Sequence, residues 1–288
     1  MFELIDRYAL VTGGARGIGR GIALALAQQG AHVAINYVTN QERAQATATE
    51  ITNLGRKTLV IQADVSNHTQ VTSMFVQVES QWGQLDILVN NAGIVSSADF
   101  GDLTEENWDR VLNTNLKGQF LCSQAAVKLM KSRHFGRIIN IASIASGGVG
   151  VGFAKLAHYT ASKGGVVALT ENMAIDLASD GINVNAVAPG VIETDMSSDL
   201  LKNDQVKQGL LTRIPKGRVG QPADIGAAVA FLASTEADYI TGTVIYVDGG
   251  WLANWSDPEL ALNFAFCMAD WYIGDDDRPS NYLAETQK

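Results

Sequence analysis

A tyrosine and a lysine stand four residues apart in the segment YTASK, residues 159–163. The stretch from Tyr159 to Ala178 has helical periodicity, so both side chains should lie on one face of a helix. A phenol ionises with a pKa of about 10, and a neighbouring ammonium lowers that pKa because it stabilises the phenolate. Tyr159 and Lys163 could therefore exchange a proton with a ligand, although the same spacing also occurs by chance in surface helices.

The segments that would position this pair alternate between short apolar runs and longer stretches of helical periodicity. The apolar runs predict strands at residues 8–12, 31–36, 58–62, 85–89, 137–142, 183–187 and 243–247. The periodic stretches predict helices at residues 17–29, 41–54, 69–82, 105–116, 119–131, 159–178 and 222–233. This alternation predicts the α/β class, with a doubly wound parallel sheet (a Rossmann fold) in a single domain. Ligands bind such sheets at the carboxyl ends of the strands.

The sequence changes character after Trp251, where no further strand is apparent. We predict one domain over residues 1–251 and a C-terminal extension over residues 252–288. An apolar set in and before this extension needs burial: Trp251, Trp255, Phe264, Phe266, Met268, Trp271 and Tyr272. The extension could cap a ligand cleft or pack on a subunit interface, and the sequence favours neither.

A glycine-rich turn, TGGARGIG, joins the first predicted strand to the first helix. Backbone N–H groups in such a turn can approach a pyrophosphate, and the helix N-terminus favours negative charge. A Cβ atom at Gly13 or Gly19 would obstruct that approach. The turn departs from the G-x-G-x-x-G fingerprint at Ile22, and no Gly-Lys-Ser/Thr follows that would make it a Walker loop. It therefore indicates a dinucleotide site.

The second strand ends at Asn36 and Tyr37, where an acidic residue would bind the ribose 2′-hydroxyl of NAD. No carboxylate stands there, and Arg16 lies in the glycine turn. A neutral strand end near a guanidinium suits the 2′-phosphate of NADP, because arginine binds phosphate through paired hydrogen bonds. We therefore favour NADP(H), with use of both NADP and NAD as the alternative.

Six motifs follow one another at the ends of predicted strands. They are Gly13, Gly17 and Gly19 of the TGxxxGxG turn; Asp64-Val65; Asn90-Asn91-Ala92-Gly93; Asn115 in NTNLKG; Ser143 with the Tyr159/Lys163 pair; and Pro189-Gly190 with Thr194. With Asp248-Gly249-Gly250 at the end, the sequence resembles the short-chain dehydrogenase/reductase superfamily from about Leu4 to Trp251. The resemblance implies an NAD(P)-dependent oxidoreductase that moves a hydride between a nicotinamide and a carbonyl or secondary alcohol.

The resemblance also implies a role for four catalytic candidates. Tyr159 would donate a proton to the carbonyl oxygen during reduction and accept it during oxidation. Lys163 would lower the pKa of Tyr159, helped by the charge of an oxidised nicotinamide, and contact the nicotinamide ribose. Ser143 would hydrogen-bond the substrate oxygen, and Asn115 would hold a water that links Lys163 to solvent.

The candidate cofactor site follows from these motifs and from the neutral end of the second strand. Its members are Gly13, Arg16, Gly17, Ile18, Gly19, Asn36, Tyr37, Asp64, Val65, Asn91, Ala92, Gly93, Tyr159, Lys163, Pro189, Gly190, Ile192 and Thr194. We predict no metal, because His32, His68 and His134 show no grouping typical of ligands.

Sixteen positions separate Ser143 from Tyr159, more than is usual in this superfamily. Ser146 lies closer to the usual distance, but INIAS, ending at Ser143, matches the family's fifth strand. We favour Ser143, with Ser146 as the alternative and the glycine-rich residues 147–152 as an insertion that flanks the substrate. His158 should point away from the reacting atoms, because adjacent helix residues face different directions.

The substrate is less clearly indicated. The sequence resembles both sugar 1-dehydrogenases and 3-oxoacyl-carrier-protein reductases, and NYV after the second strand with HYTASKGG around Tyr159 slightly favours a sugar or polyol. The segment 194–218, which covers the substrate in this superfamily, selects neither. A non-enzymatic NAD(P)-binding regulator is a third reading, disfavoured because Tyr159, Lys163 and Ser143 are all present.

Composition limits the partners. The net charge of −9 and the absence of a Lys/Arg cluster argue against nucleic acid, and no apolar run is long enough to cross a membrane. Two isolated cysteines and an N-terminus without a signal peptide predict a cytoplasmic protein. The resemblance implies a homotetramer built on the helices around residues 107–131 and 159–178.

Overall fold

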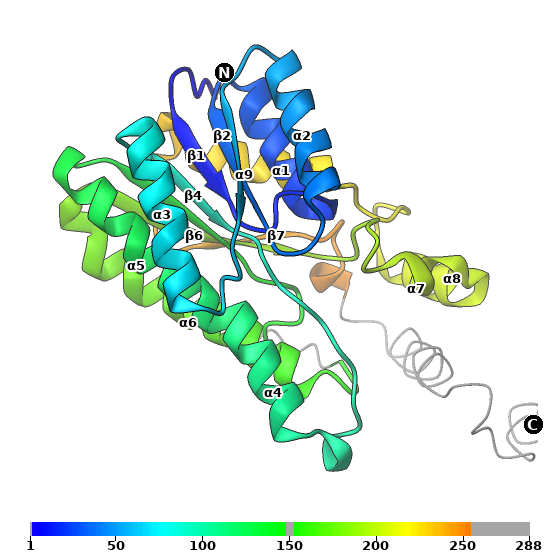
Figure 1. Cartoon of the computed structure of the whole chain (residues 1–288). Coiled ribbons are helices and arrows are strands. Elements are labelled where there is room, and N and C mark those ends of the chain that lie inside the picture. The colour runs from blue at the N-terminus through cyan, green and yellow to red at the C-terminus, as the bar shows by residue number, and fades with distance from the viewer. Residues whose placement is uncertain (1, 148–152, 255–288) are drawn as a thin grey trace, which may run out of the picture.

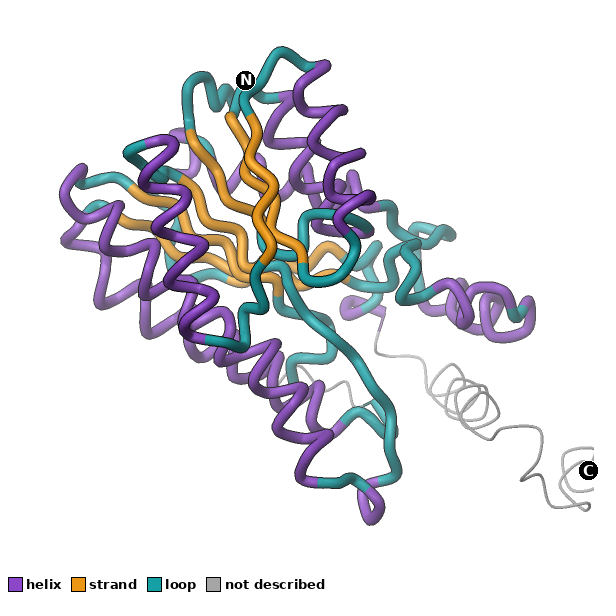
Figure 2. The backbone as a smooth tube through the Cα atoms, in the orientation of Figure 1, coloured by secondary structure: helices purple, strands orange, loops and turns teal. Residues whose placement is uncertain are grey.

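The computed structural model describes residues 2–147 and 153–254. Seven parallel strands form one sheet in the order β3-β2-β1-β4-β5-β6-β7. Figure 2 shows the strands gathered in the middle of the molecule, with helices on either side. Their bounds are β1 Tyr8–Val11, β2 His32–Tyr37, β3 Thr58–Gln62, β4 Ile87–Asn90, β5 Gly136–Ile141, β6 Ile182–Pro189 and β7 Val244–Val247. The predicted α/β class and doubly wound parallel sheet are confirmed, with strand ends displaced by at most two residues.

Helices cover both faces of this sheet. Their bounds are α1 Gly17–Gln28, α2 Gln41–Asn53, α3 His68–Trp82, α4 Glu105–Leu112, α5 Gly118–Met130, α6 Ala157–Leu177, α7 Ser198–Lys202, α8 Asp204–Arg213 and α9 Pro222–Ala233. Short 3-10 turns lie at Phe100–Asp102, Lys131–Arg133, Ala178–Asp180, Thr235–Ala237 and Leu252–Asn254. In Figure 1, α1, α2 and α9 lie on one side of the sheet, and α3, α5 and α6 lie on the other.

The two layers follow from the alternation of side chains along each strand. In β1, Ala9 and Val11 are fully buried in the cluster that includes residues of α1, α2 and α9. Leu10, between them, is buried in the cluster that includes residues of α3, α5 and α6. Successive strand residues point to opposite faces, so both faces of this strand must be apolar.

The chain departs from the predicted elements in two places. The helices predicted at 105–116 and 119–131 form one run, in which a π-helical turn at Asn113–Lys117 links α4 to α5. The segment 194–218 contains α7 and α8, which were not predicted. Asn203 caps α8 by accepting hydrogen bonds from the N–H groups of Gln205 and Val206, a cap that could have been recognised in the sequence.

The strand order reverses between β1 and β4, so the chain connections leave a crevice at the carboxyl ends of these strands. The predicted extension is described only as far as Asn254, so its division from residues 1–251 stays a prediction, and Trp255 and the later aromatic residues lie outside the described residues. Within the described ranges, no helix is long and apolar enough to cross a membrane.

Candidate active site

The glycine turn lies against the loop that follows β4. Gly13 has a positive φ of 63°, and a Cβ there would come within 3.1 Å of the Cα of Ala92. A Cβ at Gly19 would lie 2.2 Å from the carbonyl oxygen of Gly13 and 2.5 Å from Nδ2 of Asn91. Both positions therefore require glycine for the turn to keep this shape.

The turn leaves the start of α1 open to an anion. Arg16 is the N-cap residue of α1, and it makes no side-chain hydrogen bond to the first turn. The first turn, which begins with Gly17 and Ile18, carries no acidic residue. Free N–H groups and the helix dipole favour a phosphate at this position. The turn thus fits the pyrophosphate of a dinucleotide.

Asn36 at the end of β2 stabilises the glycine turn by hydrogen bonds. Its side chain is fully buried, accepts a hydrogen bond from the N–H of Gly13 at 3.2 Å, and donates to the carbonyl of Ala63 at 2.8 Å. Its own carbonyl accepts from the N–H of Gly14 at 3.0 Å. The structure thus places Asn36 as a brace for the turn, while Tyr37 beside it is 8% exposed.

Thr12 performs a second bracing role that the sequence analysis missed. Its hydroxyl accepts hydrogen bonds from the N–H groups of Asn91 and Ala92, at 2.9 and 3.0 Å. Asn91 in return donates through Nδ2 to the carbonyl of Thr12 at 2.8 Å. Thr12 is the first residue of the TGGARGIG turn, and that position was the available signal. These bonds hold the ends of β1 and β4 together.

The remaining cofactor candidates lie at the ends of β3 and β6. Asp64 accepts hydrogen bonds from the N–H and hydroxyl of Ser66, at 2.9 and 2.8 Å, while Val65 is buried. Pro189 ends β6, and Gly190 lies so near Asp248 that a Cβ would meet its Cα at 2.7 Å. All these residues lie at the carboxyl edge of the sheet.

The segment after β6 approaches the glycine turn. Ile192 is 5% exposed, and it pairs with Gly220 in a single parallel bridge. A Cβ at Gly17 would lie 3.3 Å from Cγ2 of Thr194. Thr194 therefore lies beside the glycine turn, where it could contact a cofactor bound to that turn.

Tyr159, Ser143 and Lys163 converge where β5 ends and α6 begins. A side-chain hydrogen bond joins Ser143 to the phenol of Tyr159. Nζ of Lys163 lies 5.8 Å from the centre of the Tyr159 ring and donates to the carbonyl of Ile141 at 2.7 Å. Lys163 is 4% exposed, so this site holds a buried amine next to a phenol.

Ionisation of this pair differs from the sequence-based expectation. Burial raises the pKa of Tyr159, and the hydrogen bond with Ser143 opposes that rise without overcoming it. Burial lowers the pKa of Lys163 to about 8, because the ammonium loses hydration. Desolvation is thus the largest cause of the shift in both groups, and for Tyr159 it acts against the acidification expected from Lys163.

Asn115 ties the catalytic helix to the loop after β4. Its side chain accepts a hydrogen bond from the N–H of Ile94 at 2.8 Å and donates to the Ile94 carbonyl and to Ser162 Oγ, at 2.9 and 3.1 Å. The hydroxyl of Ser162 donates to the carbonyl of Tyr159 at 2.7 Å. The π-helical turn brings Asn115 to this position, in keeping with the frequent occurrence of such turns at functional sites.

His158 and Ser146 lie beside the catalytic candidates. Nε2 of His158 is 2.8 Å from the hydroxyl of Ser96, and burial, reinforced by Arg110, lowers the His158 pKa. The imidazole is thus engaged with the loop after β4. Ser146 is 7% exposed, and its carbonyl oxygen lies 2.7 Å from a Cβ built at Gly164. Most of the glycine-rich insertion after it lies outside the described residues.

An apolar wall adjoins Ser143. The next residue, Ile144, is buried in a cluster that joins the loop after β5 to α7, α8 and the residues after β7. Its members are Ile144, Val206, Leu210, Ile214 and Trp251, with Phe153, Val191, Leu201 and Leu252 packed against them. The rings of Phe153 and Trp251 lie 6.3 Å apart. The segment 194–218 is thereby attached to the wall by its apolar residues.

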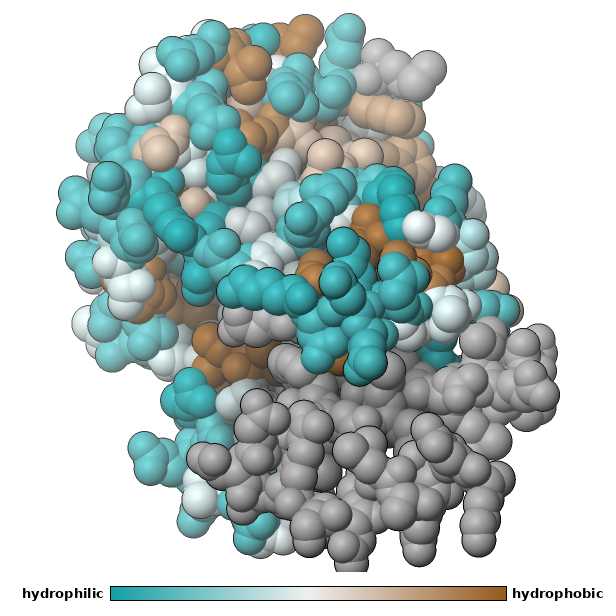
Figure 3. Space-filling view, turned by 90° about the vertical axis from the view of Figure 1, so that its right-hand side faces the viewer, coloured by the Kyte–Doolittle hydropathy of each residue, from teal (hydrophilic) through white to brown (hydrophobic). Residues whose placement is uncertain are grey.

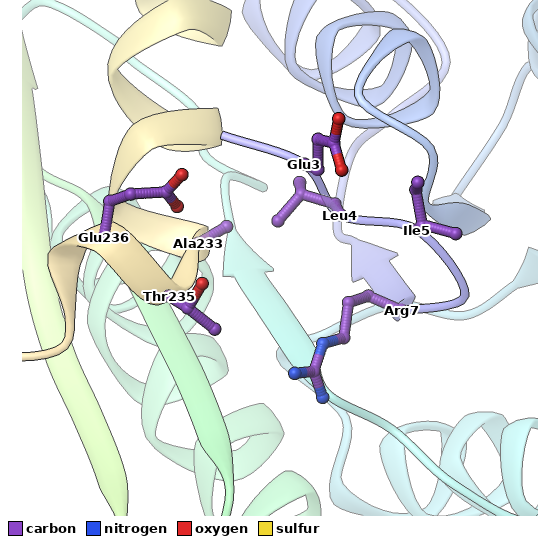
Figure 4. Close-up of a pocket in the computed structure, with 7 residues that line it drawn as sticks. All are labelled: Glu3, Leu4, Ile5, Arg7, Ala233, Thr235 and Glu236. Atoms are coloured by element: carbon purple, nitrogen blue, oxygen red, sulfur yellow. The ribbon is translucent and has the colours of Figure 1, made fainter. Parts of the chain in front are cut away.

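Two cavities lie at opposite edges of the sheet, one at the carboxyl ends of the strands and one at their amino ends. One of about 790 Å³ lies between α1 and the segment after β6, and its lining includes Gly17 and Thr194. The other, of about 500 Å³, is shown in Figure 4 and lies before β1, at the amino ends of the strands. The second therefore belongs to the opposite edge. Within the described ranges, no three or more His, Cys, Asp or Glu residues group as a metal site.

Comparison with known proteins identifies the family. The protein-family model described as enoyl-(acyl carrier protein) reductase matches residues 13–252 of the sequence. The chain therefore belongs to the short-chain dehydrogenase/reductase superfamily. It is an NAD(P)-dependent oxidoreductase that acts on CH–OH and C=O groups, which confirms the predicted enzyme class.

Relatives of this chain differ in the substrates that their names give. The chain is 48% identical over 246 residues to 3-oxoacyl-[acyl-carrier-protein] reductase FabG of Staphylococcus aureus, covering 85% of this chain and 98% of that protein. It is 42% identical over 254 residues to 2-dehydro-3-deoxy-D-gluconate 5-dehydrogenase of Escherichia coli, covering 88% and 98%. The crystal structure of a gluconate 5-dehydrogenase from Burkholderia cenocepacia, in complex with NADP and tartrate, matches with a TM-score of 0.82 and 37% identity, covering 88% and 97%.

Proposed function

We propose that this chain interconverts a ketone and a secondary alcohol with NADP(H), using Tyr159 to move the proton. The observation that carries the proposal is the convergence of Tyr159, Ser143 and Lys163 at the edge where the glycine turn opens. Bound nicotinamide would supply or accept the hydride. Asn115, Ser143, Tyr159 and Lys163 form the proposed catalytic set, and the eighteen cofactor candidates remain proposals, with Asn36 in a bracing role.

The proton steps follow from the positions of these side chains. In reduction, the phenol of Tyr159 donates its proton to the carbonyl oxygen as charge develops there. The hydroxyl of Ser143, already bonded to that phenol, can donate to the same oxygen. A pKa of about 8 keeps Lys163 largely protonated at neutral pH, so its ammonium can stabilise the phenolate that remains. Asn115 keeps α6 in register with the loop after β4.

Arg16 supports the preference for NADP(H). Its guanidinium is exposed beside the glycine turn, and β2 ends at Tyr37 without a carboxylate. Arginine recognises phosphate through paired, charge-assisted hydrogen bonds. Two solved relatives of this chain were determined with bound NADP.

For the substrate, we propose a 3-oxoacyl group carried on a thioester. The partly buried side chains of Phe153, Leu201 and Leu252, on the apolar cluster that contains Ile144, suit an acyl chain, and burial of each methylene contributes about 0.8 kcal/mol. FabG proteins at 48% identity agree with this choice. The sugar or polyol favoured by the sequence is the second candidate, supported by the gluconate dehydrogenases.

A substrate panel separates these candidates. NADPH and NADH oxidation would be followed with 3-oxoacyl thioesters of increasing chain length and with keto-acids derived from sugars, and the reverse reaction with sugars, gluconate and polyols. We expect kcat/KM to rise with acyl chain length until the wall is covered, at about three- to fourfold per methylene. Turnover of sugar acids with no response to acyl thioesters would contradict the acyl proposal. No turnover of any substrate, with tight NADPH binding, would favour the regulator.

Replacement of each serine tests the choice of Ser143 over Ser146. Ser143→Ala should lower kcat/KM about a hundredfold, because the variant loses a donor to the developing oxyanion. Ser146→Ala should change kcat/KM less than threefold, since Ser143 is the serine bonded to Tyr159. Steady-state rates on the best substrate of the panel measure both effects. A larger loss in Ser146→Ala would reverse the assignment.

The assembly and location stay predictions. Phe120 on α5 and Ile175 on α6 are 44% and 79% exposed, which supports a homotetramer built on these helices. A cytoplasmic location and the absence of nucleic-acid and membrane partners rest on the sequence arguments. For the C-terminal extension, a lid and an interface element both stay predictions.

A further inference from the structure

Two arginines converge on one carboxylate between the glycine turn and the start of α2. Asp195 Oδ2 lies 3.3 Å from Nη1 of Arg16 and forms a second ion pair with Nη1 of Arg43. The three side chains come from the β1–α1 turn, the first turn of α2 and the segment after β6. Sequence separations of 152 and 179 residues made this cluster invisible to local patterns.

The position of the cluster relates it to the adenosine half of a dinucleotide. The ribose lies at the end of β2 in this type of sheet, and α2 begins four residues after Tyr37. Arg43 is therefore on the same side of the glycine turn as the expected ribose. The exposed fractions of Arg16 and Arg43 side chains, 65% and 50%, leave both accessible to a ligand.

The two guanidinium groups of this cluster could bind a phosphate, and the carboxylate of Asp195 now lies between them. Guanidinium groups bind carboxylate and phosphate oxygens with the same geometry. The hydrogen bond from Arg43, followed by that from Arg16, lowers the pKa of Asp195, so the carboxylate is ionised at neutral pH. Two positive charges match a phosphate dianion better than a single carboxylate. Asp195 therefore occupies groups that a phosphate would use.

The same carboxylate is attached to the segment over the active site. Thr194 precedes it, and the hydroxyl of Ser197 accepts from the N–H of Thr194 at 3.0 Å and donates to the carbonyl of Ile192 at 2.6 Å. Helix α7 follows at once, and Leu201 packs against the apolar wall. A change in the partners of Asp195 would thus reach the start of α7 directly.

We propose that Arg43 joins Arg16 in holding the 2′-phosphate of NADP(H), and that Asp195 is an internal competitor which the phosphate displaces, releasing the segment 194–202 from the glycine turn. This inference rests on the proposed preference for NADP(H). NAD(H) has no 2′-phosphate, so it would bind while the Asp195 ion pairs persist. The two coenzymes would then leave the segment over the substrate in different states.

Adenosine phosphates with and without the 2′-phosphate test the proposal without turnover. Calorimetry would give the affinity of 2′,5′-ADP and 5′-AMP for the wild type, Arg43→Gln and Asp195→Asn. We expect Arg43→Gln to weaken 2′,5′-ADP about tenfold and Asp195→Asn to tighten it about three- to tenfold. Binding of 5′-AMP should change less than twofold in both. Hydrogen exchange of residues 194–202 should rise on binding 2′,5′-ADP, and should already be high in free Asp195→Asn.

Matched controls separate these effects from net charge. Arg20 is an exposed arginine of α1 paired with Glu50, and Arg20→Gln should leave the ratio of the two affinities within twofold. Glu193, two residues before Asp195, accepts a hydrogen bond from the side chain of Gln221. Glu193→Gln should therefore also leave the ratio of the two affinities within twofold. Melting temperatures of all variants should stay close to that of the wild type, because the altered side chains are exposed.

The outcomes distinguish the inference from the proposed function. Preference of the wild type for 2′,5′-ADP that neither Arg43→Gln nor Asp195→Asn alters would refute the arginine pair and keep the NADP(H) preference. Weaker binding of 2′,5′-ADP by Asp195→Asn would show that Asp195 supports binding of the 2′-phosphate and does not compete with it. Equal affinities for both nucleotides in the wild type and in Asp195→Asn would refute the NADP(H) preference and the inference together.

Discussion

Replacing Tyr159 by phenylalanine should lower kcat about a thousandfold. The ring keeps its packing, but the site loses the hydroxyl that is bonded to Ser143 and that would carry the proton. General acid–base catalysis contributes about a hundred- to ten-thousandfold in rate. The measurement is NADPH oxidation with the best substrate, together with nucleotide affinity by calorimetry. The affinity should change less than about threefold, because the glycine turn and its braces are untouched.

A tyrosine elsewhere provides the control for this change. Tyr246 lies on the edge strand β7 and is 36% exposed, so Tyr246→Phe should retain wild-type kcat. Residual turnover in Tyr159→Phe above a tenth of the wild-type rate would contradict the proton-transfer role. Such a result would transfer the role to another group, for which the hydroxyl of Ser143 beside the phenol is a candidate.

Replacing Lys163 by methionine should lower kcat about a hundredfold and yet stabilise the cofactor-free protein. The ammonium that supports the phenolate is lost, which accounts for the rate. At pH 7 the folded chain keeps Lys163 protonated although burial lowers its pKa from 10.5 to about 8, a cost of about 3 kcal/mol. Methionine removes that cost and also the hydrogen bond to Ile141, so we expect a net gain of about 1–3 kcal/mol in the free energy of unfolding.

The dependence on pH gives this prediction a second measurement. Between about pH 8 and pH 10 the unfolded chain binds a proton at Lys163 that the folded chain has released, so the wild type gains stability as pH rises. Lys163→Met lacks this term, and its advantage should shrink over the same range. Urea unfolding from pH 7 to pH 10 measures both proteins. A variant less stable than the wild type at pH 7 would show that the buried ammonium stabilises the fold.

A surface lysine controls for the loss of charge. Lys131 forms an exposed ion pair with Asp180 at 2.7 Å, and Lys131→Met should change the free energy of unfolding by less than about 0.5 kcal/mol. Its kcat should equal that of the wild type. An equal gain in both variants would assign the stabilisation to methionine itself rather than to the desolvated ammonium.

Short sequence patterns were sufficient to predict most of the fold and part of the candidate site. Runs of apolar residues gave the seven strands of the parallel sheet, because burial on both faces requires them to be continuous. The spacing of Tyr159 and Lys163 follows from the geometry of one helix. The glycines of the turn form a short sequence motif, although the close approach that requires glycine at position 19 includes Asn91, which is distant in the chain. Each of these sequence signals lies within a few consecutive residues.

The sequence by itself determined the sheet, the glycine turn and the candidate pair Tyr159 and Lys163, since spacing and periodicity express local geometry, and the family resemblance of INIAS added Ser143. The tertiary structure decided the bracing role of Asn36, the ionisation of Lys163 and the pairing of Arg43 with Asp195. Those properties depend on burial and on contacts between residues far apart in the chain, and no local pattern records either. Desolvation in particular changes a pKa through the whole surrounding structure.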